Sequence, residues 1–310
     1  MHLLIPFACS SVPACTQALE RLQLPHLDKL LRRLVAAGTD SDEASSLSPP
    51  HERALARVHA LSAADGCIAW AAHALAVSGR DPGTEGWGWV TPVHWDVGTD
   101  HITMAVPGTL ELAQEESRAL LAAMQPFFAE DGIALEFLNA RRWQARGDIL
   151  GNFASASLDR VAGREISAWM PSEPSLRRLQ NEMQMLLYTH PVNDARSARG
   201  QPAINSFWIS GTGRLPGSAT AQHVVGLVVA DGLRDAALRN DWEAWAQGWV
   251  RMDQHECQRL LQAMDAGVGA TLTLCGERNA LSLRTANDGM LSRLRRQFTH
   301  TTLRHLQHQL

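Results

Sequence analysis

Short apolar runs alternate with amphipathic stretches along the chain. Residues 2–8 are apolar and predict a buried first strand. Residues 25–37 carry apolar side chains at helical spacing and precede Gly38, a residue type favoured at helix C-termini. Residues 223–230 form a near-continuous apolar run, which is typical of a strand buried on both faces of a parallel sheet. Strands and helices in this alternation favour an α/β fold.

The middle of the chain predicts two strands, an amphipathic helix and a further strand, in residues 89–95, 101–106, 115–129 and 133–138. This β-β-α-β order indicates a compact inserted α+β module. We therefore expect a core formed by residues 1–88 and 206–310, and an inserted module with its connecting helix in residues 89–205.

Residues 39–50 are acidic and rich in Ser and Pro, and predict a loop. Five further helices are expected, in residues 51–61, 68–77, 176–187, 241–250 and 254–264, and a basic C-terminal helix in residues 291–310. Asp253 is a natural N-cap for the helix that starts at residue 254.

The helix at residues 241–250 carries a stripe of indole side chains at helical spacing, formed by Trp242, Trp245 and Trp249. Such a stripe usually lies in a core. It could instead bind a protein partner or a second copy of the chain, as could the basic C-terminal helix.

Composition narrows the function classes. With 310 residues, 45% of them hydrophobic, the chain can bury a substantial core. Its net charge is −4 and Lys29 is its only lysine, so no basic stripe suited to a nucleic-acid backbone stands out. Five cysteines without a Cys-x-x-Cys pair fit reduced thiols in a cytoplasm. No apolar run approaches the ~20 residues that span a bilayer.

Residues 188–213 are the most informative stretch. A predicted helix end supplies histidine, asparagine and arginine side chains ahead of a predicted strand at residues 204–210. Arginine side chains grip phosphate and carboxylate groups at two points, so this stretch predicts a pocket for an anionic small molecule. The alternative is a structural turn in which these side chains satisfy backbone groups. The candidate ligand-binding residues are His190, Asn193, Arg196, Arg199, Asn205 and Arg214.

The same stretch resembles a known family. The archaeal-type cofactor-independent phosphoglycerate mutases, of the alkaline phosphatase superfamily, have a helix ending in His-Pro-Val-Asn, then an Arg, a Gly, and an Asn-x-x-Trp strand that ends in Gly-x-Gly. The matching positions here are residues 190–193, Arg196, Gly200, Asn205, Trp208, Gly211 and Gly213. The resemblance implies an alkaline-phosphatase-like parallel sheet flanked by helices, and in active members two metal ions and a Ser or Thr nucleophile.

The metal ligands of that family are not evident in this chain. The family's first strand ends in a metal-binding Asp, whereas here the corresponding residues are Pro6, Phe7 and Ala8. Ser48 lies about where the nucleophile loop should fall, although it could equally cap a helix. We therefore expect a non-catalytic, metal-free relative similar to the bacterial RpfE-type regulatory proteins, which binds an anionic (phosphorylated) small molecule or a protein partner.

The alternative is an active metal-dependent phosphoryl-transfer enzyme of the phosphoglycerate mutase or phosphatase type, using Mn²⁺ or Zn²⁺. Asp96 and His101 lie in a predicted hairpin whose donor types suit such a metal. The full set of residues that could supply ligands is Asp40, Asp42, His51, Asp96, His101, His223 and Asp231.

Overall fold

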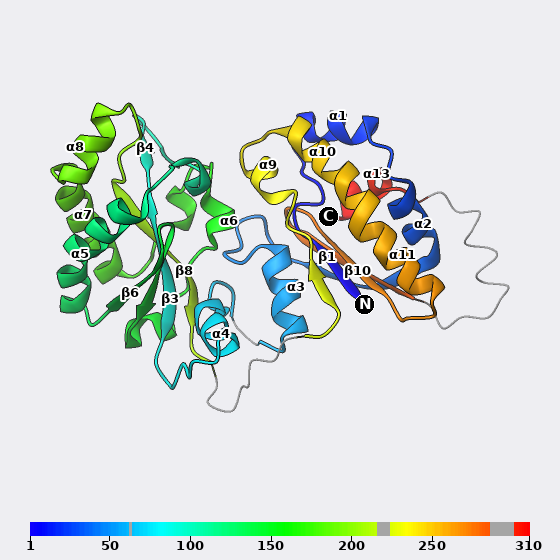
Figure 1. Ribbon diagram of the computed structural model, residues 1–310, viewed down its shortest axis with the longest axis horizontal. Helices are drawn as coiled ribbons and strands as arrows, with labels where there is room; N and C mark the ends of the chain where they lie inside the picture. Colours follow the sequence, from blue (N-terminus) through cyan, green and yellow to red (C-terminus); the bar gives the residue numbers. More distant parts are fainter. Residues whose placement is uncertain (62–63, 216–223, 286–300) are drawn as a thin grey trace. The chain divides into compact units, whose positions relative to one another are not determined.

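The computed structural model describes residues 1–61, 64–215, 224–285 and 301–310, and the chain forms two compact units (Figure 1). Unit 1 consists of residues 1–44, 49–58 and 224–310, and unit 2 of residues 45–48 and 59–223. Residues 59–88 and the strand at residues 206–213 thus belong to unit 2, whereas the sequence-based boundaries assign them to the core.

Unit 1 contains a five-stranded mixed sheet in the order β2-β11-β10-β1-β9, in which β1 (His2–Ile5) lies beside the central strand. β1 pairs in parallel with β10 (Thr271–Cys275) on one side and with β9 (Leu227–Val229) on the other. β11 (Asn279–Thr285) then pairs antiparallel with β10, and β2 (Leu34–Ser41) with β11. The sheet has helices packed on it, so the predicted α/β class is confirmed.

Side chains of β1 alternate between two apolar clusters. Leu3 and Ile5 pack with residues of the large helical cluster, whereas Leu4 packs with Ala54 on the opposite face, and all three strand side chains are fully buried. Burying apolar surface on both faces is the main stabilisation of such a strand. The helices of unit 1 are α1 (Pro13–Arg21), α2 (Pro25–Arg33), α3 (Pro50–Val58), α9 (Arg234–Leu238), α10 (Trp242–Met252), α11 (Gln258–Asp265) and α13 (Leu303–Leu306).

The predicted helix at residues 25–37 is too long. α2 ends at Arg33, and residues 34–41 form β2, whose backbone pairs with β11. The apolar spacing is helical only within α2, and pairing with a distant strand decides the conformation after it. The composition had predicted a loop over residues 39–50, but residues 39–41 belong to a strand.

The apolar run at residues 223–230 is also not a central strand. Within it β9 covers only Leu227–Val229, lies at an edge of the sheet, and leaves Val229 41% exposed. The prediction of a central strand buried on both faces is wrong, because β9 pairs on one side only and none of its three residues is fully buried. His223 lies outside the described residues.

Asp253 does not cap the helix that follows it. α10 continues through a π-helical turn (Asp253–Cys257) into α11, so no helix starts at residue 254. Asp253 instead accepts hydrogen bonds from the main-chain N–H groups of His26 and Leu27, at the start of α2. Of the predicted C-terminal helix, residues 291–300 lie outside the described residues, and the rest forms α13 and a 3-10 turn (Gln307–Gln309).

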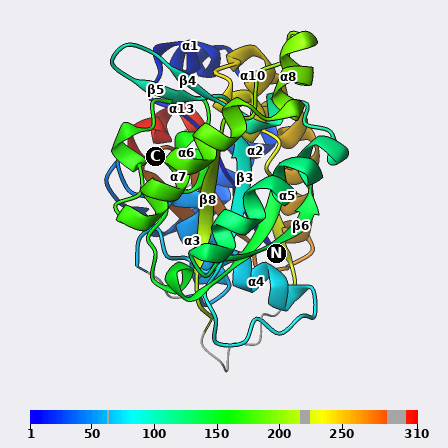
Figure 2. The ribbon, with the colours of Figure 1, turned by 90° about the vertical axis from the view of Figure 1, so that its left-hand side faces the viewer.

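Unit 2 is built on a four-stranded antiparallel sheet in the order β6-β7-β3-β8. Helices α5 and α7 share a large apolar cluster with this sheet, and α4 contacts β3 and β8 (Figures 1 and 2). The strands are β3 (Trp87–Val93), β4 (Trp95–Val97), β5 (Ile102–Met104), β6 (Ala134–Asn139), β7 (Arg142–Arg146) and β8 (Ser206–Gly213). The helices are α4 (Trp70–Val77), α5 (Gln114–Glu130), α6 (Leu158–Val161), α7 (Pro174–Tyr188) and α8 (Pro191–Ala198), with 3-10 turns at Pro107–Thr109, Asp148–Gly151 and Ser167–Trp169.

This unit agrees with the α+β composition expected for the middle of the chain. The predicted helix and strand at residues 115–129 and 133–138 are present as α5 and β6. None of the described helices is both long and apolar enough to cross a bilayer.

Candidate functional site

The carboxyl ends of the parallel strands in unit 1 are the first place to look for a site, because ligands of open α/β sheets bind there. The loop that follows β1 is fixed by two indole groups. Trp245 Nε1 donates to the Phe7 carbonyl at 2.9 Å, and Trp249 Nε1 donates to the Ala8 carbonyl at 3.2 Å. Phe7 has a left-handed backbone with φ of 55°, which costs energy for a side chain of this size and is held by its surroundings.

Polar groups at the same edge are bonded to other parts of the unit. The Glu277 carboxylate, just after β10, accepts from the hydroxyls of Ser10 and Ser11 at 2.7 and 2.6 Å. The main-chain N–H of Asn279 donates to the Leu310 carbonyl at 2.9 Å. These groups at the strand ends are therefore already hydrogen-bonded to other residues of unit 1.

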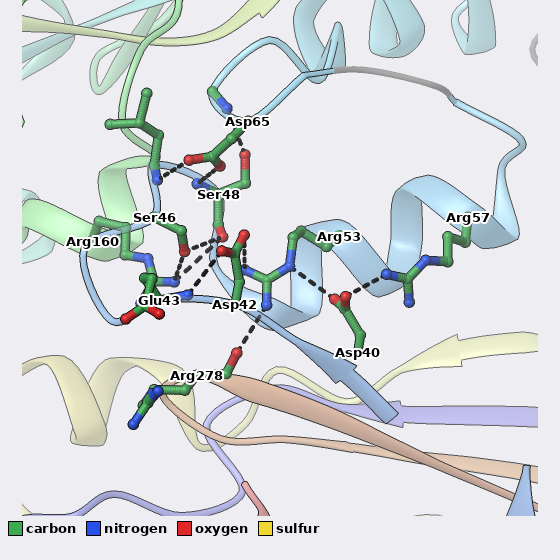
Figure 3. Close-up of polar contacts among 12 residues, drawn as sticks. Asp40, Asp42, Glu43, Ser46, Ser48, Arg53, Arg57, Asp65, Arg160 and Arg278 are labelled. Carbon is green, nitrogen blue, oxygen red and sulfur yellow. Dashed lines mark hydrogen bonds and ion pairs between the residues drawn. The ribbon is translucent and has the colours of Figure 1, made fainter. Parts of the chain in front are cut away.

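Two acidic residues of the predicted metal-ligand set are paired with arginines. The Asp40 carboxylate accepts from Arg53 Nε at 2.8 Å and from the Arg57 guanidinium, and Asp42 lies 3.8 Å from Arg53 (Figure 3). Arg53 also donates to the Arg278 carbonyl at 2.8 Å. The Asp40 and Arg53 side chains are only 9% and 12% exposed. A guanidinium group thus provides the positive charge that a metal ion would bring to Asp40.

The remaining members of that set that the structure describes do not form a cluster. Asp96 lies at an exposed position of the β4–β5 hairpin and pairs with His94 at 3.0 Å, while His101 is exposed. His51 stacks on Phe7 with 5.2 Å between ring centroids. Within the described ranges, no three His, Cys, Asp or Glu side chains are placed to hold a metal ion together.

Ser48 is buried, with 3% of its surface exposed. Its hydroxyl accepts from the Gly66 N–H at 2.9 Å, and its own N–H donates to the Asp65 carboxylate at 2.7 Å (Figure 3). Arg160 donates to the Ser46 hydroxyl at 2.7 Å and to the Ser48 carbonyl at 3.3 Å. These contacts give Ser48 a clear structural role in holding segment 45–48 within unit 2.

Arg196 is fully buried, and all of its guanidinium nitrogens have partners inside unit 2. Nε donates to the Pro202 carbonyl at 2.8 Å, and the two terminal nitrogens donate to Glu116 at 2.9 Å and to the Leu110 carbonyl at 2.6 Å. Arg199 pairs with the second carboxylate oxygen of Glu116. Partial burial alone would raise the pKa of Glu116, but an N–H donor and the two arginines lower it.

The two asparagines of the segment bond to backbone. Asn193 donates to the Leu187 and Ile204 carbonyls and accepts from the Ile204 N–H, each at 2.8 Å. Asn205 accepts from the Trp95 N–H at 2.7 Å and donates to the Trp95 carbonyl at 2.8 Å. Both side chains thus supply the donor and acceptor that a neighbouring strand would otherwise provide.

The last two candidates, His190 and Arg214, also bond to backbone groups. His190 is the N-cap of α8 and accepts from the Val192 N–H at 3.2 Å. Arg214 donates to the Thr84 carbonyl at 2.9 Å and to the Asp148 carbonyl at 3.0 Å. Specific contacts thus support the alternative that residues 188–214 form a structural turn. The role of these residues in ligand binding stays a prediction.

A further hollow lies elsewhere, on unit 1. Helices α1 and α10 are in contact and lie side by side (Figures 1 and 2). An open groove of about 870 Å³ runs along them. Trp242 lines it, whereas Trp245 and Trp249 are completely buried. The lining residues on α1 and the residue after it are Ala14, Gln17, Ala18, Arg21 and Leu22, and those on α10 are Trp242, Glu243, Ala246, Gln247, Val250 and Arg251.

The sequence and fold of the whole chain were compared with those of known proteins. No protein-family model and no curated protein matches it. Among solved structures it is similar to a cofactor-independent phosphoglycerate mutase from Thermoplasma acidophilum, with 11% identity and a TM-score of 0.36 over 93% of this chain and 90% of that one. It is also similar to the PH0037 protein from Pyrococcus horikoshii, with 14% identity and a TM-score of 0.38 over 92% and 87% of the two chains. Because the identities and TM-scores are low, we base no residue role on either structure.

Proposed function

We propose that this chain is a non-catalytic, phosphoglycerate-mutase-like protein that binds an anionic small molecule and serves a regulatory role. One observation carries the proposal. Asp40, a carboxylate that a metal-dependent phosphoryl-transfer reaction could use, is held by Arg53 and Arg57. A carboxylate bonded to two guanidinium groups is a poor ligand for a divalent cation, because the cation would have to displace both.

The strand end that follows β1 gives further support. Phe7 and Ala8 stand where the resembled family has a metal-binding Asp, and their carbonyl groups already accept indole N–H donors. Ser48, the candidate nucleophile, is buried, and its hydroxyl accepts a backbone hydrogen bond. These contacts fit a structural role for Ser48, and its main-chain N–H is bonded to the Asp65 carboxylate.

Elemental analysis together with activity assays tests the proposal. The protein would be purified without chelators or metal-affinity resin, and its Mn and Zn content measured. Phosphoglycerate isomerisation and aryl phosphate hydrolysis would then be assayed with added Mn²⁺ or Zn²⁺. We expect substoichiometric metal and no turnover. Stoichiometric metal, or turnover that Asp40→Asn abolishes in a folded variant, would favour the phosphoryl-transfer enzyme instead.

A further inference from the structure

The groove between α1 and α10 has an ordered lining. The residues Ala14, Ala18 and Leu22 are spaced by four along α1 and its C-cap, and Trp242, Ala246 and Val250 repeat the spacing along α10. Side chains four residues apart lie on one helix face, so each helix turns an apolar row towards the groove. Three of these six residues are alanines, whose small side chains leave space between the helices.

Polar rows accompany the apolar ones at the same spacing. Gln17 and Arg21 lie on α1, and Glu243, Gln247 and Arg251 lie on α10. Arg21 and Arg251 are both in the last turns of their helices and are exposed. Neither side chain makes an ion pair or hydrogen bond with a residue in the described part of the chain, which separates them from Arg53, Arg196 and Arg199.

Trp242 gives the groove an aromatic surface that is already held in place. Its ring packs edge-on against Trp245, with 5.9 Å between centroids, and Trp245 is anchored by its hydrogen bond to the Phe7 carbonyl. An apolar body that lies against a held aromatic ring gains contact area without the entropy cost of ordering the ring.

We propose that this groove binds an amphipathic organic anion, whose carboxylate or phosphate group is bound by Arg21 and Arg251 and whose aromatic or branched aliphatic body lies against Trp242. The inference rests on the proposed binding function and gives it a site. The groove volume is within the range of small-molecule sites, roughly 300–1,000 Å³. Two arginines against the single acidic lining residue, Glu243, leave an excess of positive charge for the anionic end.

Isothermal titration of the full chain with naphthoate and with naphthyl phosphate tests the proposal and distinguishes the two anionic groups. Naphthalenemethanol is the neutral control, and inorganic phosphate lacks the apolar body. We expect at least one naphthyl anion to bind at one site, more weakly at high salt, because surface charges are screened. We expect the neutral compound and inorganic phosphate to bind at least about tenfold more weakly, the equivalent of a single charge-assisted hydrogen bond.

Charge variants then locate the site. Arg251→Gln and Arg21→Gln should each weaken binding of the naphthyl anion about five- to tenfold, through loss of a charge-assisted hydrogen bond at an exposed position. Glu243→Gln should strengthen it by about two- to threefold, because a like charge is removed. Arg259→Gln, at an exposed arginine of α11 outside the groove, should leave the affinity unchanged.

Ala246→Leu adds bulk to the groove without a change in charge, and should abolish binding of the naphthyl anion in a protein that still melts cooperatively. A purely structural role of the two arginines at their helix ends would lower the melting temperature and leave the affinity as it was. That result would overturn the proposal. So would any one of three others: unchanged binding in Ala246→Leu, equal binding of inorganic phosphate, or no binding of either naphthyl anion. Metal content is a separate readout, so a metal-loaded protein that still binds naphthoate would refute the non-catalytic role alone.

Discussion

The Asp253 carboxylate accepts a hydrogen bond of 2.7 Å from the main-chain N–H of Leu27, and so caps a helix far from it in sequence. The side chain is buried, and its other oxygen accepts from His26. Loss of these contacts leaves two N–H groups at the start of α2 without an acceptor. We expect Asp253→Ala to lower the free energy of unfolding by about 2 kcal/mol or more, because an N-cap and a buried acceptor are lost together.

Urea unfolding of the full-length protein would measure that loss of stability in unit 1. Asp241→Ala is the matched control, because Asp241 caps α10 through the Ala244 N–H at 3.0 Å but is exposed. Its loss should cost only about 0.5–1 kcal/mol. An Asp253→Ala variant no less stable than Asp241→Ala would contradict the assigned role.

Arg53 and Arg57 both bind Asp40 but should contribute unequally to stability. Arg53 is mostly buried and contacts Asp40, Asp42 and the Arg278 carbonyl, whereas the Arg57 side chain is 62% exposed. We expect Arg53→Gln to destabilise the chain by about 1–3 kcal/mol, since it leaves Asp40 poorly compensated. Arg57→Gln should cost less than about 1 kcal/mol. Chemical denaturation of the two variants side by side tests this order, and equal losses would refute it.

Glu116 should make unit 2 sensitive to acid. Its pKa is lowered in the folded state by an N–H donor, Arg196 and Arg199, against the effect of burial. A lowered pKa stabilises the fold fully above the ordinary value of 4.5, and this stabilisation is lost as the pH falls through the folded value. The stability difference between wild type and Glu116→Gln should therefore be largest near neutral pH and shrink below pH 4.5.

The neighbouring Glu115 provides the control for that measurement. It lies in the same first turn of α5, but is exposed. Glu115→Gln should track the wild type across the same pH range in thermal or urea unfolding. A Glu116→Gln protein whose deficit stays constant down to pH 3 would count against the ion-pair explanation.

The five thiols should differ in reactivity. Burial raises the pKa of Cys9 to about 12 and of Cys15 to about 11, and raises that of Cys257 and Cys275. Burial and the nearby Asp65 carboxylate also raise the pKa of Cys67, but this thiol is only partly buried and is therefore the most accessible of the five. Because the thiolate is the reactive form, we expect a disulfide reagent at pH 8 to label Cys67 first in the native protein and all five thiols after unfolding. Native Cys67→Ser should react slowly, and fast labelling of this variant would show that another thiol is accessible.

Local patterns predicted much of the fold. The indole spacing on α10 placed Trp245 and Trp249 on one face, and both are buried as a core stripe usually is. The helix now called α5 and the strand β6 were found because their apolar periods are long and regular. Such elements bury one continuous face, so the spacing of their apolar residues is visible in the sequence.

The wrong predictions share one physical cause. In each, the conformation is decided by a hydrogen-bonding partner that is distant in sequence. Asp253 and Glu256 match a local capping box, yet the N–H groups that Asp253 binds are on α2. Residues 34–37 continue a helical pattern, yet β11 takes their backbone groups. The groove went unnoticed for the same reason, although the row formed by Trp242, Ala246 and Val250 was a visible signal on α10.

The position of β1 bears on how the protein is synthesised. β1 comes from the first residues of the chain, yet its parallel partners β9 and β10 come from residues 227–229 and 271–275. Unit 2 is nearly continuous between residues 59 and 223, and can be completed before either partner leaves the ribosome. Because domains fold during synthesis as their residues emerge, the apolar first strand must wait unpaired through the translation of unit 2. Residues 2–5 are then an apolar segment that chaperones can bind until β9 and β10 are synthesised, and slow translation after residue 223 would prolong this exposure.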